Sequence, residues 1–267
     1  MKLRQILLSA VAGVCLATPA SAHTSYILPN TFDATFVRVV TLESSFTDAF
    51  SRSEVGVKSQ DWHVLLPDGT RRDFDNVVEM KQLTMLEMGV SEEGTYRFTT
   101  GERLGRSGQM IRSADGSLRP ARTEEGETAA PGAGETLVSS QTATVAEVYV
   151  SKGAPTDTVV AAPAGRLVIR PMTHPNKIFA ESGLKLQVSF DGQPLAGQEL
   201  ELSRDGSVYD DSAGMQHVKT DAEGIVTLSF DAAGIYLIMT RHQAEAPAGS
   251  ETDIRSYTTS LTFDVTN

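Results

Sequence analysis

Short runs of β-forming residues separated by turn signals are the feature that most constrains the fold of this chain. Val, Ile, Thr, Tyr and Phe recur in segments of about four to ten residues between clusters of Gly, Pro and Asp. Long amphipathic helical patterns are scarce. The pattern therefore predicts a mainly β protein.

Two antiparallel β-sandwich domains of the immunoglobulin or transthyretin type fit this pattern best. The first is expected over residues 23–165 and the second over residues 166–267, with their connection in the Pro-containing segment 153–165. The strands expected in the two domains are 34–43, 62–66, 94–98, 145–150, 184–190, 198–203, 225–230, 235–241 and 256–265.

The alternation of apolar residues disappears between residues 101 and 135. This stretch is rich in Gly, Ser, Arg, Glu and Pro. Such a segment buries too little apolar surface to offset the entropy lost on ordering. We therefore expect a mobile loop over 101–135.

The first 22 residues have the three parts of a secretory signal peptide. Lys2 and Arg4 form a basic start, residues 6–17 are apolar, and Ala20-Ser21-Ala22 is a small-residue cleavage site. The apolar stretch is too short to span a bilayer, and no later segment approaches the necessary length. The leader predicts an exported, periplasmic protein whose mature chain begins at His23 and has no membrane span.

Cys15 is the only cysteine in the chain. It offers a competing site for lipoprotein acylation, but Val14 stands where a small residue is needed. Cleavage after Ala22 leaves no cysteine, so the mature chain can form neither disulfides nor thiolate metal sites. Cleavage also removes two of the 23 basic residues, and the mature formal charge becomes 21 − 34 = −13. Such an acidic chain is not expected to bind nucleic acid.

A mature N-terminal histidine is a potential metal chelate. The free α-amine and the ring Nδ1 of His23 can bind one ion together, and a further imidazole completes a flat three-nitrogen set suited to copper or nickel. His242 is expected to supply that imidazole, because it follows the strand 235–241 at an end where loops and sites gather. The alternatives are a frayed terminus for His23 and a solvent-facing strand end for His242.

The other three histidines also have structural interpretations. His63 lies within an expected strand, where a packed or hydrogen-bonded ring is the ordinary outcome. His174 precedes Pro175, which holds its backbone extended, so its ring can either bind metal or anchor a loop. His217 lies in a polar hairpin, which favours an exposed role. The candidate metal ligands are His23, His242, His174 and His63.

Several segments carry a resemblance to a known family. Those of the second half are DGQPLAG, TDAEGIVTLSF, AAGIYLIMTRH and SYTTSLTFDV. With the exported start AHTSYILP and the central MTHPNKIFAESG, they make the chain similar to exported bacterial domains associated with nickel uptake. The second domain also resembles the transthyretin-like modules attached to carboxypeptidases and outer-membrane receptors. The start departs from the family pattern in two places, where Ile27 and Leu28 replace an aromatic residue and Thr24 replaces an acidic one.

The resemblance implies a periplasmic protein that binds a divalent transition metal, nickel or copper, and assists its uptake or handling. An envelope transporter or a TonB-dependent receptor is the implied partner. The first alternative is a non-catalytic interaction module of the cell envelope that needs no metal. The second alternative is a copper oxidase that uses the terminal histidine to activate oxygen.

Familiar catalytic motifs do not occur in the sequence. It contains no P-loop glycine pattern, no GxSxG elbow and no HExxH motif. Aromatic residues make up 6% of the chain and include one tryptophan, which leaves little surface on which an oxidase could stack sugars. The chain is therefore expected not to be an enzyme.

Overall fold

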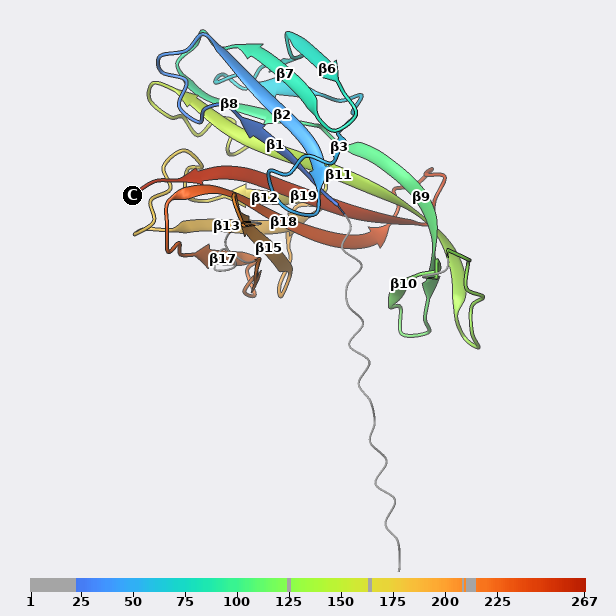
Figure 1. The fold of residues 1–267 in the computed structure, drawn as a ribbon. Coiled ribbons are helices and arrows are strands. Elements are labelled where there is room, and N and C mark those ends of the chain that lie inside the picture. The colour runs from blue at the N-terminus through green and yellow to red at the C-terminus, as the bar shows by residue number, and fades with distance from the viewer. Residues whose placement is uncertain (1–22, 124–125, 163–164, 208, 210–214) are drawn as a thin grey trace, which may run out of the picture.

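The computed structural model describes residues 23–123, 126–162, 165–207, 209 and 215–267, whose arrangement Figure 1 shows. The regular elements of these residues are β-strands, so the predicted fold class is confirmed. None of the described segments forms a helix long and apolar enough to cross a membrane. The predicted signal peptide, residues 1–22, lies outside the described residues.

The strands form three sheets, named here the N-terminal, central and C-terminal sheets. The N-terminal sheet has the order β1-β2-β7-β6 with β3 on β2, and consists of β1 (Thr24–Pro29), β2 (Val39–Thr47), β3 (Val55–Gly56), β6 (Asn76–Glu79) and β7 (Thr84–Gly89). The central sheet has the order β16-β15-β18-β19-β11-β8-β4-β5. Its strands are β4 (His63–Leu65), β5 (Arg71–Arg72), β8 (Gly94–Thr99), β11 (Thr136–Lys152), β15 (Glu199–Arg204), β16 (Gln216–Lys219), β18 (Gly234–Glu245) and β19 (Ile254–Val265). Two further strands extend it: β9 (Arg103–Arg112) pairs with β11, and β10 (Leu118–Pro120) pairs with β9. The C-terminal sheet consists of β12 (Leu167–Pro171), β13 (Leu184–Phe190), β14 (Gln193–Pro194) and β17 (Ile225–Leu228).

The N-terminal and C-terminal sheets cover opposite faces of the central sheet. Leu42 of β2 and Val148 of β11 belong to the core of the first half. Leu186 of β13 and Ile238 of β18 belong to the core of the second half, and Tyr149 of β11 belongs to it as well. Successive residues of β11 thus enter different cores, as the two-residue alternation of a strand requires. Two β-sandwiches share one central sheet.

The two halves are joined by the pairing of β11 with β19, which lie side by side and run parallel. Val159 and Val160 of the connecting segment are buried in the core of the second half. The boundary expected near residue 165 therefore falls beside a packed segment. The division into two domains remains a prediction.

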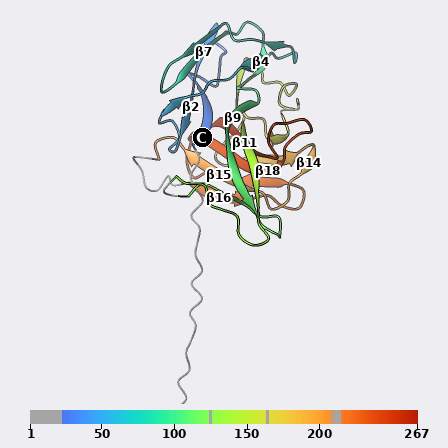
Figure 2. The ribbon, with the colours of Figure 1, turned by 90° about the vertical axis from the view of Figure 1, so that its right-hand side faces the viewer.

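The range 101–135, expected as a mobile loop, contains the strands β9 and β10. Strand β9 pairs with β11 from Arg103 to Arg112, and β10 pairs with β9. Figure 2 shows β9 beside β11, and Figure 1 shows the ribbon reaching away from the two sandwiches. Backbone hydrogen bonds to β11 stabilise this ribbon, and half of the β9 side chains are exposed. The buried residues of β9, Met110 and Ile111, are adjacent and do not alternate with exposed ones, which is why the sequence pattern did not reveal the strand.

A buried ion pair lies between neighbouring strands of the central sheet. Arg97 of β8 donates from Nε to Glu147 Oε1 of β11 at 2.8 Å and from Nη2 to the same oxygen. Its Nη1 donates to the carbonyl oxygen of Ala162 at 3.1 Å. Burial opposes the charge of Arg97, but the Glu147 carboxylate outweighs burial and raises the pKa of Arg97 above its ordinary value. Each charge therefore depends on the other.

Removal of one member of this pair is expected to destabilise the protein strongly. Glu147→Leu leaves the Arg97 guanidinium buried without its carboxylate, and the free energy of unfolding should fall by about 3–5 kcal/mol. Urea denaturation measures this change. The double variant Arg97→Met/Glu147→Leu removes both charges and should lose less than Glu147→Leu alone. Equal losses in the two variants would contradict an energetic role for the unpaired charge.

Candidate metal centre

The pairing of β1 with β2 places His23 beside an acidic residue. The antiparallel register pairs Thr24 with Thr47, so the residues that follow outward, His23 and Asp48, lie opposite each other. Strand β3 then pairs Val55 with Phe46 of β2. The loop 48–54 between β2 and β3 therefore begins and ends close to His23.

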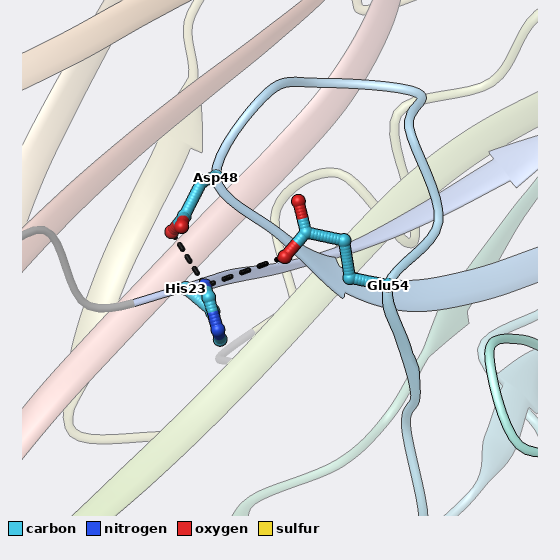
Figure 3. Close-up of side chains that lie close together, drawn as sticks. All are labelled: His23, Asp48 and Glu54. Atoms are coloured by element: carbon cyan, nitrogen blue, oxygen red, sulfur yellow. Dashed lines mark hydrogen bonds and ion pairs between the residues drawn. The ribbon is translucent and has the colours of Figure 1, made fainter.

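Three side chains meet at this point, as Figure 3 shows. His23 Nδ1 lies 2.5 Å from Asp48 Oδ1 and 3.7 Å from Glu54 Oε2. One ligand atom from each of the three residues lies within 4.8 Å of the others. Nearly half of the His23 and Asp48 side-chain surfaces is exposed, at 47% and 46%, so an ion can reach the cluster from solvent.

The loop 48–54 is held by contacts on both sides. Phe50 is buried and meets the Tyr26 ring edge-on, with ring centroids 5.6 Å apart. The Tyr26 hydroxyl and Ser53 Oγ form a hydrogen bond of 2.8 Å. Ser51 has a φ of 66°, and its hydroxyl donates to Asp205 in the second half of the chain. These contacts hold the loop that carries both carboxylates.

A cation lies beside the cluster. Arg241 of β18 donates from Nη2 to Thr24 Oγ1 at 3.2 Å. Burial lowers the pKa of Arg241, and the charges of Glu201 and Asp48 oppose that change. The positive charge of Arg241 offsets part of the negative charge that Asp48 and Glu54 would otherwise concentrate here.

The structure does not bring His23 and His242 together. Arg241 and Leu237 point to the face of the central sheet that carries β1, because Leu237 packs against Tyr26. His242 follows Arg241 directly and therefore points to the opposite face. Its ring lies against Phe190 of the C-terminal sheet, with ring centroids 4.6 Å apart.

His174 and His63 lie apart from His23 and form no metal group among the residues that the structure describes. The Nδ1 of His174 accepts from the Asn176 amide at 3.1 Å, and its Nε2 lies 3.1 Å from Thr95 Oγ1. Both ring nitrogens are thus used, and the ring anchors the loop. Burial lowers the pKa of His174, which favours the neutral ring.

The remaining two histidines have local partners. His63 Nδ1 donates to the carbonyl oxygen of Asp61 at 2.7 Å within the first half. His217, which is exposed, lies 3.2 Å from Glu199 Oε1 on the neighbouring strand. Of the predicted ligands, His23 is the one that the structure places in a group suited to a metal ion.

Sequence reasoning missed Asp48 and Glu54. Neither belongs to a short motif with a histidine, and 25 residues separate His23 from Asp48. The available signal was the pairing of the segment 24–29 with the segment 42–47, which places residues 23 and 48 opposite each other. That register cannot be read from either segment alone.

His242 is expected to contribute to acid sensitivity of the fold. Burial and the positive charge of Arg166 lower the pKa of His242, while Asp191 opposes them. Below the ordinary imidazole pKa of about 6.5, the unfolded chain binds a proton at His242 more readily than the native fold does. The stability present above that pH is therefore lost as the pH falls toward the pKa of the folded state.

Urea denaturation at about pH 7.5 and about pH 5.5 measures this effect. His242→Gln should lose less unfolding free energy between the two conditions than the native protein does. His217→Gln, which changes an exposed histidine, is the matched control and should behave like the native protein. The same loss in His242→Gln and the native protein would contradict the assignment.

The family of the chain follows from its match to a family model. The model is described as a domain of unknown function, DUF4198, and it matches residues 20–244. The chain belongs to the DUF4198 family. This match covers both halves of the molecule and includes the segment that carries His23, Asp48 and Glu54. The nickel-uptake function and the transthyretin-like module implied by the resemblance remain predictions.

Two solved structures are similar to this DUF4198 protein at low levels. The D0–D1 domain of intimin is 9% identical, with 89% of this chain and 96% of that chain covered and a TM-score of 0.22. Trypsin-activated α2-macroglobulin from Escherichia coli is 10% identical, with 91% of this chain and 16% of that chain covered and a TM-score of 0.24. Neither likeness carries an argument about function. No curated protein matches the sequence.

Proposed function

We propose that this DUF4198 protein is a non-catalytic periplasmic protein that captures one divalent transition-metal ion, copper or nickel, and passes it to an uptake system. The observation that carries the proposal is the cluster of His23, Asp48 and Glu54 at the predicted start of the mature chain. The chelate expected from the sequence keeps its first two nitrogen ligands, the His23 amine and Nδ1. Two carboxylates take the place that the second imidazole was expected to fill.

The chemistry of these donors fits the proposed ions. Imidazole binds copper, nickel and zinc, and a tetragonal set of nitrogen and oxygen donors is typical of Cu(II) and Ni(II). His23 Nδ1 is the ring nitrogen that can close a chelate ring with the α-amine of the same residue. It is also the nitrogen that faces Asp48 and Glu54. The amine, Nδ1 and the two carboxylates can therefore bind one ion together.

The copper oxidase alternative is less well supported. An oxidase of that type uses a second imidazole beside the terminal histidine, and the group around His23 contains only carboxylates among the described residues. His242, the expected second imidazole, lies on the other face of the central sheet. Capture of an ion needs no open face for oxygen and agrees better with this donor set.

The ribbon of β9 and β10 favours the interaction module as a second candidate function. The ribbon reaches away from the two sandwiches, as Figure 1 shows, and half of the β9 side chains are exposed. Such an extended strand pair offers backbone and polar side chains to an outer-membrane receptor or transporter. A module of this kind needs no metal, so metal titration separates the two candidates.

The proposed centre requires cleavage immediately before His23. Intact mass of the protein recovered from the periplasm should correspond to residues 23–267, because Ala20-Ser21-Ala22 is a small-residue cleavage site. A mature chain that starts elsewhere would lack the terminal amine of His23 and would contradict the proposed chelate.

The natively cleaved protein is expected to bind one Ni(II) or Cu(II) ion, as calorimetry measures. A Met added before His23 moves the free amine away and should weaken binding by about tenfold or more. Asp48→Asn/Glu54→Gln removes both anionic donors and should also weaken binding. Affinity should fall as the pH falls, because protons compete with the metal for the amine and the imidazole.

His242→Ala is the matched control for these variants. It removes a histidine that lies outside the cluster, so metal affinity should remain that of the native protein. Equal affinities in the native, Met-extended and Asp48→Asn/Glu54→Gln proteins would reject the centre and leave the interaction module ahead.

A further inference from the structure

A pocket opens directly beside His23 and carries two arginines. Its cavity of about 310 Å³ is lined by His23, Phe46, Val55, Arg103, Arg106, Thr142, Thr144 and Thr258. This volume is at the small end of the range for ligand sites, about 300–1,000 Å³. The apolar wall comes from the N-terminal sheet, the guanidinium groups come from β9, and the hydroxyl groups come from β11 and β19.

A β-bulge brings both arginines to the same pocket. Residues three apart on a regular strand point to opposite faces, so Arg103 and Arg106 should diverge. The register between β9 and β11 shifts here, since Gln141 pairs with Ser107 while Ala143 pairs with Leu104. Gly105 and Arg106 therefore oppose the single residue Thr142, and the extra residue turns Arg106 to the side of Arg103.

Glycine is required at this bulge. A Cβ on residue 105 would lie 2.3 Å from Thr142 Oγ1 and 3.1 Å from Arg103 Nη1. A larger residue would push the ribbon away from β11 or displace Arg103. The close approach thus depends on the same residue that creates the bulge.

Among the described residues, no carboxylate forms an ion pair with either arginine. Arg103 donates from Nε to the Lys58 carbonyl oxygen at 2.7 Å, and its guanidinium carbon lies 4.9 Å from the Phe46 ring centroid. The adjacent Glu102 pairs with Arg255 instead, at 3.7 Å. Burial and the like charge of Arg106 lower the pKa of Arg103. In a chain of net charge −11, two neighbouring cations with no acidic ion-pair partner in the described part of the chain mark a local anion site.

We infer that this pocket binds a small polycarboxylate, and that the metal ion at His23 is captured as an anionic chelate of that ligand. The inference rests on the proposed function, because His23 is shared by the pocket and the metal cluster. Guanidinium groups bind carboxylates through paired N–H donors. A polycarboxylate seated on Arg103 and Arg106 can direct a further carboxylate to an ion held by His23, Asp48 and Glu54.

Equilibrium dialysis with radiolabelled citrate, with and without Ni(II), tests the inference on the natively cleaved protein. One citrate per protein is expected in the presence of Ni(II), with much weaker retention in its absence. Arg106→Gln should reduce this retention by about tenfold or more while Ni(II) binding without citrate stays unchanged. Arg112→Gln is the matched control, because Arg112 lies on the same strand but forms an ion pair with Glu245 outside the pocket. This variant should retain citrate as the native protein does.

The outcomes separate this inference from the proposed function. The protein could bind Ni(II) by itself, while added citrate removes the ion and is not retained. That result would overturn the chelate and leave the proposed metal capture in place. Citrate retention that ignores Ni(II) would likewise overturn the chelate. Failure of the protein to bind Ni(II) in any form would reject the proposed function, and the chelate with it.

Discussion

The parallel pairing of β11 with β19 is the contact on which the arrangement of the two halves depends. Nine residue pairs, from Ser140 with Ile254 to Val148 with Thr262, join a strand of the first half to the last strand of the chain. Side chains of this pair enter both cores, with Val148 in that of the first half and Leu261 in that of the second. Removal of either half would expose apolar surface of the shared sheet. The expected domain boundary in the sequence therefore does not correspond to a separation between the two halves in the structure.

The position of the candidate metal centre follows from this shared sheet. Ser260 of β19 donates from Oγ to the Ser25 carbonyl oxygen at 2.6 Å, which holds β1 across the central sheet. Leu237 of β18 packs with Tyr26 and Phe50 in a small third core. Residues of the second half therefore fix both β1 and the loop 48–54. His23 lies at a junction of the two halves, where a bound ion would contact groups that both halves position.

The sequence predicted those strands whose alternation faces a core. The segment 184–190 agrees with β13, and 94–98 lies within β8, because each has one face or both faces buried. The ribbon of β9 was missed, since half of its residues are exposed and its two buried residues, Met110 and Ile111, are adjacent, which gives no apolar period. The first expected strand, 34–43, begins too early, because β2 starts at Val39. The candidate site was found in part. His23 followed from the leader, whereas Asp48 and Glu54 depend on a strand register that composition does not encode.

The two-residue alternation of strands decides which side chains can act with His23. On β18 a single step along the chain separates Arg241, which reaches Thr24, from His242, which contacts Phe190 on the far face. A regular strand therefore excludes the histidine that sequence reasoning selected. On β9 the bulge at Gly105 breaks the same rule and turns Arg106 toward the pocket that His23 lines. A bulge costs a regular backbone pairing, and one that gathers like charges has no evident benefit to the fold alone. Its position beside an exposed histidine and two carboxylates is explained if the pocket binds an anion together with the metal.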